Sequence, residues 1–140
     1  MRAETYLKQI EESECRIDNK IAEIQRLEAL AEDISPHLAE VKVSSTPNPH
    51  RAQEVWTRLI DARDELFDEV NELLDLRMEV TRTLQKLPPE DYNILFNLYV
   101  LQKPVQRVAD EKHYTRQAIY YIRDRGLEEL QKILDSREKF

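Results

Sequence analysis

Apolar residues recur every seven positions along most of the first 87 residues, and this spacing restricts the fold more than any other feature of the chain. A seven-residue repeat is typical of a helix that packs along a narrow seam against one or two other helices. The later part of the region follows the repeat regularly: Leu59, Leu66, Leu73, Val80 and Leu87. The earlier part follows it through Tyr6, Ile10, Ile17, Ile24, Ala31 and Leu38, while Ser13 and Lys20 interrupt the neighbouring register. We therefore expect two long helices that form an imperfect coiled coil.

The segment "SSTPNPH", residues 44–50, separates these two patterns. Small polar residues with two prolines predict a loop, and proline is well placed in the first turn of a following helix. The second helix is therefore expected to begin near Pro49 or Arg51 and to run to about Leu87. Two such helices joined by a short loop most simply fold back as an antiparallel hairpin, which can pair with a second copy into four helices. An isolated hairpin would leave much of Trp56 and Phe67 exposed.

Two further proline positions predict helix boundaries. Pro36 is expected to end or kink the first helix near Ile34. The segment "LPPED", residues 87–91, is expected to stop the second helix and to start another one, because acidic residues favour a helix N-terminus. The chain is thus predicted to divide into a helical hairpin or coiled coil over residues 1–87 and a second domain over residues 88–140.

Composition favours an all-α protein and argues against several classes of site. The 140 residues include one glycine and one cysteine, and 35% of them are charged. A single glycine argues against a phosphate-binding loop, and a lone Cys15 forms neither an intrachain disulfide nor a cysteine zinc site. No apolar run approaches the ~18–20 residues that span a bilayer. We expect a cytoplasmic protein without a membrane partner, cofactor, metal site or catalytic residue, and so not an enzyme.

Three short helical patterns follow residue 88, over residues 89–101, 104–111 and 115 to about 135. The last two have the features of a helix-turn-helix. Ala109 is small enough for a close helix crossing, Thr115 is a good N-cap, and Ile119 and Ile122 point back to the core at helical spacing. The fold is therefore predicted as an N-terminal hairpin followed by a C-terminal helix-turn-helix domain.

Charge is distributed unevenly between the two regions. Residues 1–87 hold 19 acidic and 12 basic side chains, whereas residues 88–140 hold nine of each. Within residues 101–125 there are six basic and three acidic side chains. Because phosphate contacts dominate nucleic-acid affinity, the part of the chain best suited to meet DNA is this basic segment.

The stretch "LPPEDYNILFNLYVLQKPVQRVADEKHYTRQAIYYIRDRGLEELQKIL" resembles region 4 of sigma-70-type factors. Together with the helical N-terminal region, the chain is similar to the sigma-region-4-like regulators of phages and prophages of Gram-positive bacteria, the ArpU and RinA kind of late-gene activator. Two positions depart from this pattern, because His113 stands where the family usually has glycine and Lys112 where it more often has an apolar residue. The resemblance implies a bacterial host and two sets of DNA-contacting residues. The recognition helix would present Thr115, Arg116, Gln117, Tyr120 and Tyr121 to the major groove, and the DNA backbone would lie near Lys103, Arg107, Lys112 and Arg123.

The resemblance and the basic segment predict a sequence-specific regulator of transcription that binds double-stranded DNA as a homodimer. Contact with RNA polymerase stays open, as does the question of which of Tyr120 and Tyr121 faces the DNA. The alternatives are a small-terminase-like DNA-packaging protein and an RNA-polymerase-binding adaptor that does not bind DNA. A magnesium-dependent nucleotide hydrolase is a further alternative, because carboxylates share a helix face in residues 61–75: Asp61, Glu65, Asp68, Glu69 and Glu72. A solvated acidic face is the simpler reading of that run.

Overall fold

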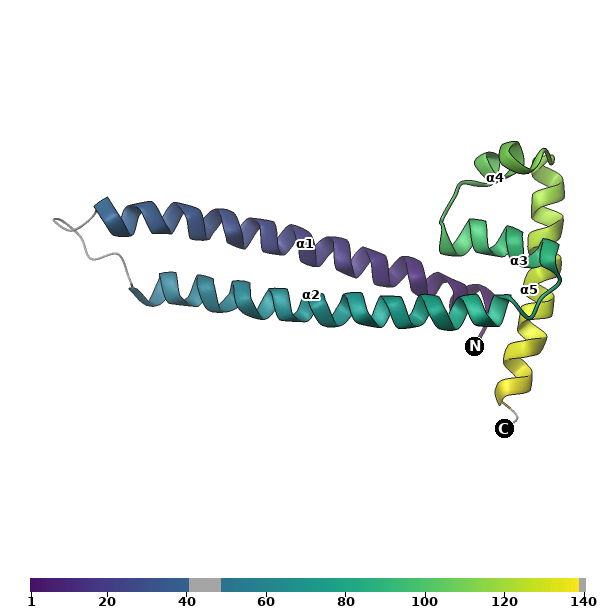
Figure 1. Ribbon diagram of the computed structural model, residues 1–140, viewed down its shortest axis with the longest axis horizontal. Helices are drawn as coiled ribbons and strands as arrows, with labels where there is room; N and C mark the ends of the chain where they lie inside the picture. The colour runs from purple at the N-terminus through teal and green to yellow at the C-terminus, as the bar shows by residue number, and fades with distance from the viewer. Residues whose placement is uncertain (41–48, 139–140) are drawn as a thin grey trace. The chain divides into compact units, whose positions relative to one another are not determined.

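The computed structural model describes residues 1–40 and 49–138 and is all-helical over these ranges, without a β-strand (Figure 1). Its elements, in chain order, are α1 (Ala3–Glu40), α2 (Pro49–Leu84), α3 (Pro89–Leu95), the π-helical turn η1 (Phe96–Val100), α4 (Val105–Lys112) and α5 (Arg116–Glu138). The all-α prediction is confirmed. Residues 44–48 of the predicted loop lie outside the described residues.

The predicted boundaries of the long helices are correct except at Pro36. α1 continues past Pro36 to Glu40, so of the two outcomes expected near Ile34, an end or a kink, the end is wrong. Proline removes its own backbone donor and its ring crowds the carbonyl four residues earlier, but these local effects can kink a helix without ending it. α2 begins at Pro49 as predicted and ends at Leu84, slightly before the expected Leu87.

The predicted helix over residues 89–101 is interrupted by a π-helical turn. The Leu101 N–H donates to the Phe96 carbonyl five residues earlier, over 3.0 Å. Within this turn, the side-chain amide of Asn97 donates back to the carbonyl of Asn93 in α3 over 2.7 Å. Gln102 then adopts a positive φ of 54° and turns the chain toward α4. π-helical turns are short and interrupt α-helices locally, so apolar spacing alone gives no sign of them.

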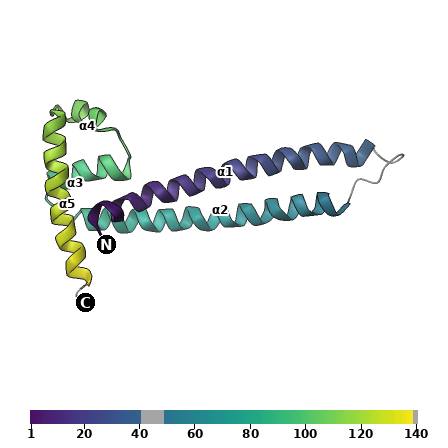
Figure 2. The same ribbon diagram turned by 180° about the vertical axis from the view of Figure 1, so that it is seen from behind.

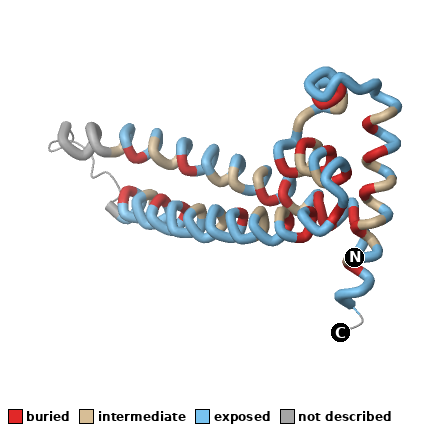
Figure 3. The backbone as a smooth tube through the Cα atoms, turned by 45° about the vertical axis from the view of Figure 1, so that its right-hand side comes forward, coloured by how far each residue is buried: buried red, intermediate tan, exposed pale blue. Residues whose placement is uncertain are grey.

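Internal contacts divide the chain into two compact units, Cys15–Glu72 and Met1–Glu14 with Leu73–Phe140. These limits differ from the predicted division at residue 87, which stays a prediction. In the unit Cys15–Glu72 the α1 and α2 segments run antiparallel, and buried positions recur along their facing sides (Figures 2 and 3). Ile24, Leu59 and Ala62 form the buried cluster, with Leu27 and Leu66 packed against it.

Among the described residues of the unit Cys15–Glu72, two ion pairs join the helices. The Lys20 ammonium lies 2.6 Å from a Glu65 carboxylate oxygen, and the Arg63 guanidinium lies 2.9 Å from Glu28. The hydrogen bond with Glu65 is the main cause that raises the pKa of Lys20. Such exposed pairs contribute little to stability, so the apolar seam supplies most of the attraction between these helices.

The other unit combines the start of α1 and the end of α2 with α3, α4 and α5. The Ala3 N–H donates to the Gln131 side chain over 2.7 Å, and the Tyr6 hydroxyl lies 3.1 Å from that of Thr83. Arg137 of α5 donates to the same Thr83 hydroxyl over 2.8 Å. Thr83 is fully buried, so these hydrogen bonds satisfy a polar group that would otherwise be costly to bury.

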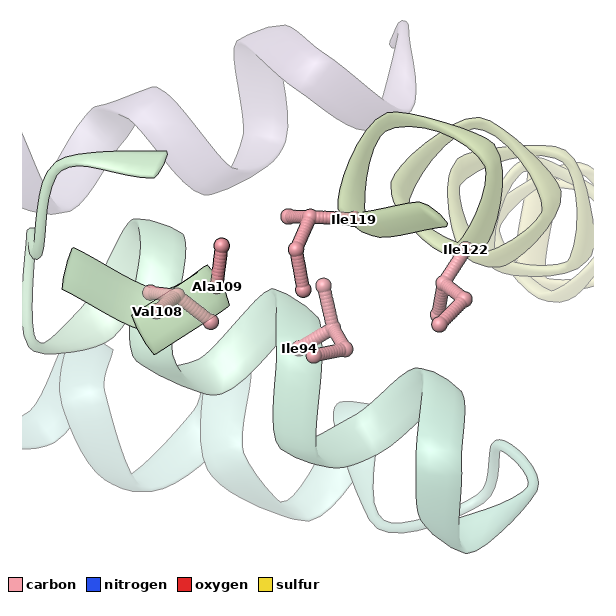
Figure 4. Packing of buried hydrophobic residues seen from close by; sticks show 5 residues of the cluster. All are labelled: Ile94, Val108, Ala109, Ile119 and Ile122. Carbon is pink, nitrogen blue, oxygen red and sulfur yellow. The ribbon is translucent and has the colours of Figure 1, made fainter. Parts of the chain in front are cut away.

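A small apolar cluster holds α3, α4 and the start of α5 together. Ile94 of α3, Val108 and Ala109 of α4, and Ile119 and Ile122 of α5 point into a common core (Figure 4). The predictions that Ala109, Ile119 and Ile122 are core residues are confirmed.

Gly126 marks a second close contact, between α5 and α3. A Cβ atom at this position would lie 3.0 Å from Leu95 Cδ1 and 3.4 Å from Asp91 Cβ. α5 is continuous through this glycine. Gly126 therefore marks a close approach of two helices and not a break in one, and a side chain here would require Leu95 to move by a few tenths of an ångström.

Candidate nucleic-acid interface

A tight turn of three residues connects α4 and α5. His113 adopts the left-handed conformation with φ 59° and ψ 38°, and the Tyr114 N–H donates to the Ala109 carbonyl over 2.9 Å. The Ala118 N–H donates to the Thr115 side-chain oxygen over 3.1 Å, so Thr115 caps α5 as predicted. A residue with a side chain pays a conformational cost in the left-handed region, which explains why glycine would suit position 113.

The two helices on either side of this turn pack closely because Ala109 is small. Ala109 and Ile119 are both buried, with 1% and 0% of their surfaces exposed. Ile122, one turn further along α5, is buried in the same cluster. This packing fixes which side of α5 faces the core and leaves the opposite side to the solvent.

The solvent-facing side of α5 changes from uncharged to acidic along its length. At about 100° per residue, Gln117, Tyr121, Asp124 and Glu128 all lie roughly opposite Ile119. These four side chains are exposed. Gln117 and Tyr121 occupy the first two turns, where a positive helix end also favours phosphate, and the carboxylates follow after them. A polyanion can therefore meet only the N-terminal part of this face without opposing charge.

The two adjacent tyrosines have different surroundings. Tyr121 is 67% exposed and Tyr120 is 36% exposed. The Arg123 guanidinium lies over the Tyr120 ring, 4.9 Å from its centroid, and covers one ring face. The Arg125 guanidinium lies 5.7 Å from the Tyr121 ring centroid. Tyr121 thus offers more of its ring to a partner.

Arg125 is held in place by two carboxylates at the start of α3. Its Nε and Nη2 donate to Asp91 Oδ1 over 3.0 and 2.6 Å, and Nη2 donates to Glu90 over 3.0 Å. The hydrogen bonds with Asp91 and then Glu90 raise the pKa of Arg125 above its ordinary value. Glu90 also accepts a hydrogen bond from the Tyr114 hydroxyl over 3.1 Å, which raises the pKa of Tyr114. The start of α3 is therefore tied both to the turn and to α5.

The basic side chains predicted to lie near DNA fall into two groups. Lys103 and Arg107 both donate to Glu111, over 2.9 and 3.1 Å. Arg123 pairs with Asp124 over 2.9 Å. Within the described ranges, Lys112 and Arg116 have no ion-pair partner. The cations with no competing carboxylate thus flank the turn itself.

Sequence reasoning missed Glu111 and the pairing of Asp91 with Arg125. The Glu111–Arg107 pair has the four-residue helical spacing at which opposite charges meet, so the sequence contains a signal for it. Asp91 and Arg125 are 34 positions apart, and only the packing of α3 on α5 brings them together.

The acidic run 61–75 shows no metal-binding arrangement in the part of the chain that the structure describes, where no group of three or more His, Cys, Asp or Glu side chains is placed to hold an ion. Glu65, one of its members, pairs with Lys20 instead. Among the same residues no helix is both long and apolar enough to cross a membrane.

Comparison with known proteins gives one match. A family described as "Protein of unknown function (DUF1492)" matches residues 33–131, which include the turn between α4 and α5. No curated protein and no solved structure matches the chain.

Proposed function

The chain belongs to this family of unknown function, and we propose that it is a sequence-specific regulator of transcription that binds double-stranded DNA. In this proposal α4, the turn and α5 form a helix-turn-helix, and α5 is the recognition helix. The regulator would be a phage or prophage late-gene activator, as the resemblance to sigma-region-4-like proteins implies. The observation that carries the proposal is the tight turn at His113, which leaves Arg116, Gln117 and Tyr121 exposed at the start of α5.

The exposed residues at the start of α5 have the chemistry that base reading requires. Arginine pairs with guanine and glutamine with adenine through two hydrogen bonds each in the major groove. Recognition helices insert their N-terminal residues, which here are Arg116 and Gln117. Asp124 and Glu128 on the same face would keep the later turns of α5 out of the groove. We assign Tyr121 as the tyrosine that faces DNA, because it is 67% exposed whereas Tyr120 is 36% exposed.

The two cations of this surface that are unpaired among the described residues have separate roles in this proposal. Lys112 at the end of α4 would meet a backbone phosphate, whereas Arg116 at the start of α5 would read bases. Thr115 would stay with the cap of α5, since its side-chain oxygen already accepts the Ala118 N–H. Lys103, Arg107 and Arg123 would contribute less, because each pairs with a carboxylate of its own chain.

Selection of bound sequences from a random duplex library at near-physiological salt tests this proposal. The expected result is enrichment of one motif, whose selection is weakened by Gln117→Ala. Replacement of Ser136, an exposed residue far along α5, is the matched control and should leave the motif unchanged. Failure to enrich any motif would contradict the proposal, and binding to RNA polymerase without DNA binding would favour the adaptor alternative.

A homodimer fits an apolar stripe on α2 in the unit Cys15–Glu72. Trp56, Ile60, Phe67 and Val70 are 45%, 56%, 68% and 36% exposed. Helical geometry puts them within about 80° of one another, beside the face that packs on α1. The two aromatic residues alone expose on the order of 200 Å², given about 150–250 Å² for each aromatic side chain. Arg63, which pairs with Glu28, lies on the same side between Ile60 and Phe67, so the stripe consists of two apolar patches. Exposed apolar patches of this kind can mark a contact surface.

The partner that we propose for this stripe is a second copy of the chain. A single small DNA-binding module binds weakly, and linking two modules raises their effective concentration on paired half-sites. Sedimentation of Phe67→Glu should show a lighter particle than the original chain. Thr57→Glu adds the same charge to an exposed position rotated by about 80° from Phe67 and should not change the mass. A ring of many copies would instead favour the packaging alternative.

A further inference from the structure

Glu111 is the point at which two cations of the proposed DNA-binding surface converge. Lys103 Nζ lies 2.9 Å from Glu111 Oε2, and Arg107 Nε lies 3.1 Å from Glu111 Oε1. Each carboxylate oxygen therefore accepts from a different cation. The hydrogen bond from Lys103, followed by that from Arg107, lowers the pKa of Glu111 below its ordinary value. The carboxylate is ionised at neutral pH and neutralises charge that would otherwise be available to a phosphate.

These pairs lie on an accessible surface. The side chains of Glu111 and Arg107 are 39% and 62% exposed, whereas that of Lys103 is 20% exposed. A phosphate oxygen and a carboxylate oxygen are chemically similar acceptors for the same donors. A DNA phosphate that approached α4 would thus compete directly with Glu111 for both cations.

We propose that Glu111 restrains the affinity of the chain for the DNA backbone by holding Lys103 and Arg107 away from phosphate. This inference rests on the proposed function and adds a residue that determines how strongly, and how salt-dependently, DNA is bound. In the intact protein the backbone contact of this surface comes mainly from Lys112. Base recognition by Arg116 and Gln117 then contributes a larger share of binding than it would if all the cations met phosphate.

Asp110 provides a control with the same change in charge. It is the neighbour of Glu111, it is exposed, and its recorded partner is the neutral amide of Gln106 at 2.9 Å. Asp110→Asn and Glu111→Gln each remove one negative charge from α4. Only Glu111→Gln releases Lys103 and Arg107.

The test measures binding to a fluorescent scrambled duplex of about 30 base pairs, roughly three turns of DNA, over a series of salt concentrations. Each additional phosphate contact steepens the slope of log affinity against log salt by about 0.9. Glu111→Gln should steepen it by about one to two units, so that a fourfold rise in salt costs up to about tenfold more affinity than in the original chain. Asp110→Asn should change the slope by much less. Adding Lys103→Gln and Arg107→Gln to Glu111→Gln should return the slope toward its original value.

Equal slopes for Glu111→Gln and Asp110→Asn would overturn the inference while leaving DNA binding intact. Weaker binding of Glu111→Gln would overturn it as well, because Glu111 would then be holding the cations toward the DNA. Thermal unfolding followed by circular dichroism verifies that both variants fold. If neither the original chain nor Glu111→Gln binds duplex DNA, the proposed function itself fails. Binding by Glu111→Gln alone would support the restraint.

Discussion

Replacement of Arg125 by methionine tests whether the start of α3 is locked onto α5 by a buried carboxylate. Asp91 is only 1% exposed, and its recorded side-chain hydrogen bonds both come from Arg125. Methionine keeps much of the length of the side chain and removes the charge, so Asp91 would remain buried without its partner. Breaking a buried ion pair in this way costs about 3–5 kcal/mol, and the 41% exposure of the Arg125 side chain favours the lower end, about 3 kcal/mol.

Arg123→Met is the matched control for this prediction. Arg123 pairs with Asp124, whose side chain is 64% exposed, and exposed pairs contribute at most about 1 kcal/mol. Urea denaturation followed by circular dichroism should therefore show a much lower unfolding free energy for Arg125→Met than for Arg123→Met.

A double-mutant cycle separates the buried charge from lost packing. Asp91→Asn combined with Arg125→Met should recover part of the loss, because the unpaired charge is then absent, with a coupling of roughly 2 kcal/mol. If Arg125→Met is as stable as Arg123→Met, or if the double variant recovers nothing, Asp91 is not a buried charge that depends on Arg125.

Substitutions at three other positions test separate parts of the structure. Gly126→Ala should lower the unfolding free energy by about 1 kcal/mol in urea denaturation. The added Cβ would lie 3.0 Å from buried Leu95, and this crowding outweighs a gain of roughly 1 kcal/mol in helix propensity. A stabilised variant would show that Leu95 can move aside. His113→Gly should raise the melting temperature by relieving a left-handed residue that costs about 1–2 kcal/mol, whereas His113→Val should lower it, and the reverse order would contradict the turn. Lys103 and then Arg107 lower the pKa of Glu111. The stability that these pairs add is therefore fully present at a pH above the ordinary pKa of glutamate, and it is lost as the pH falls through the lowered pKa of Glu111. A carboxyl NMR titration should find this pKa shifted upward in Lys103→Gln, and an unchanged value would show that the pair does not form in solution.

Local sequence rules predicted the parts of the C-terminal region that depend on neighbouring residues. Thr115 was recognisable as a cap because a hydroxyl side chain at that position can accept from the next turn of the helix. Ile119 and Ile122 were recognisable as core residues from their helical spacing, and both are buried. The exposure of Trp56 and Phe67 also followed from the narrow seam, which is too small to cover them.

The features that the sequence did not reveal depend on tertiary packing, or on a choice between two local structures that the same residues allow. Pro36 can end a helix or be accommodated inside one, and local rules do not decide between these outcomes. The π-helical turn Phe96–Val100 changes the helical period without a characteristic residue pattern. The bond between Asp91 and Arg125 requires α3 to lie on α5 at Gly126, a contact between segments far apart in the sequence. A count of basic residues therefore does not predict which cations of the candidate site are paired with carboxylates.

Site-specific photo-crosslinking to duplex DNA tests the central proposal most directly. A photoreactive side chain in place of Gln117 should crosslink to bases of a selected duplex, because this position lies on the exposed face in the first two turns of α5. The same group in place of Glu128, on the same face but three turns further along the helix, should give little crosslinking. Equal crosslinking from both positions, or none from position 117 in a duplex that the chain binds, would contradict the assignment of α5 as a recognition helix.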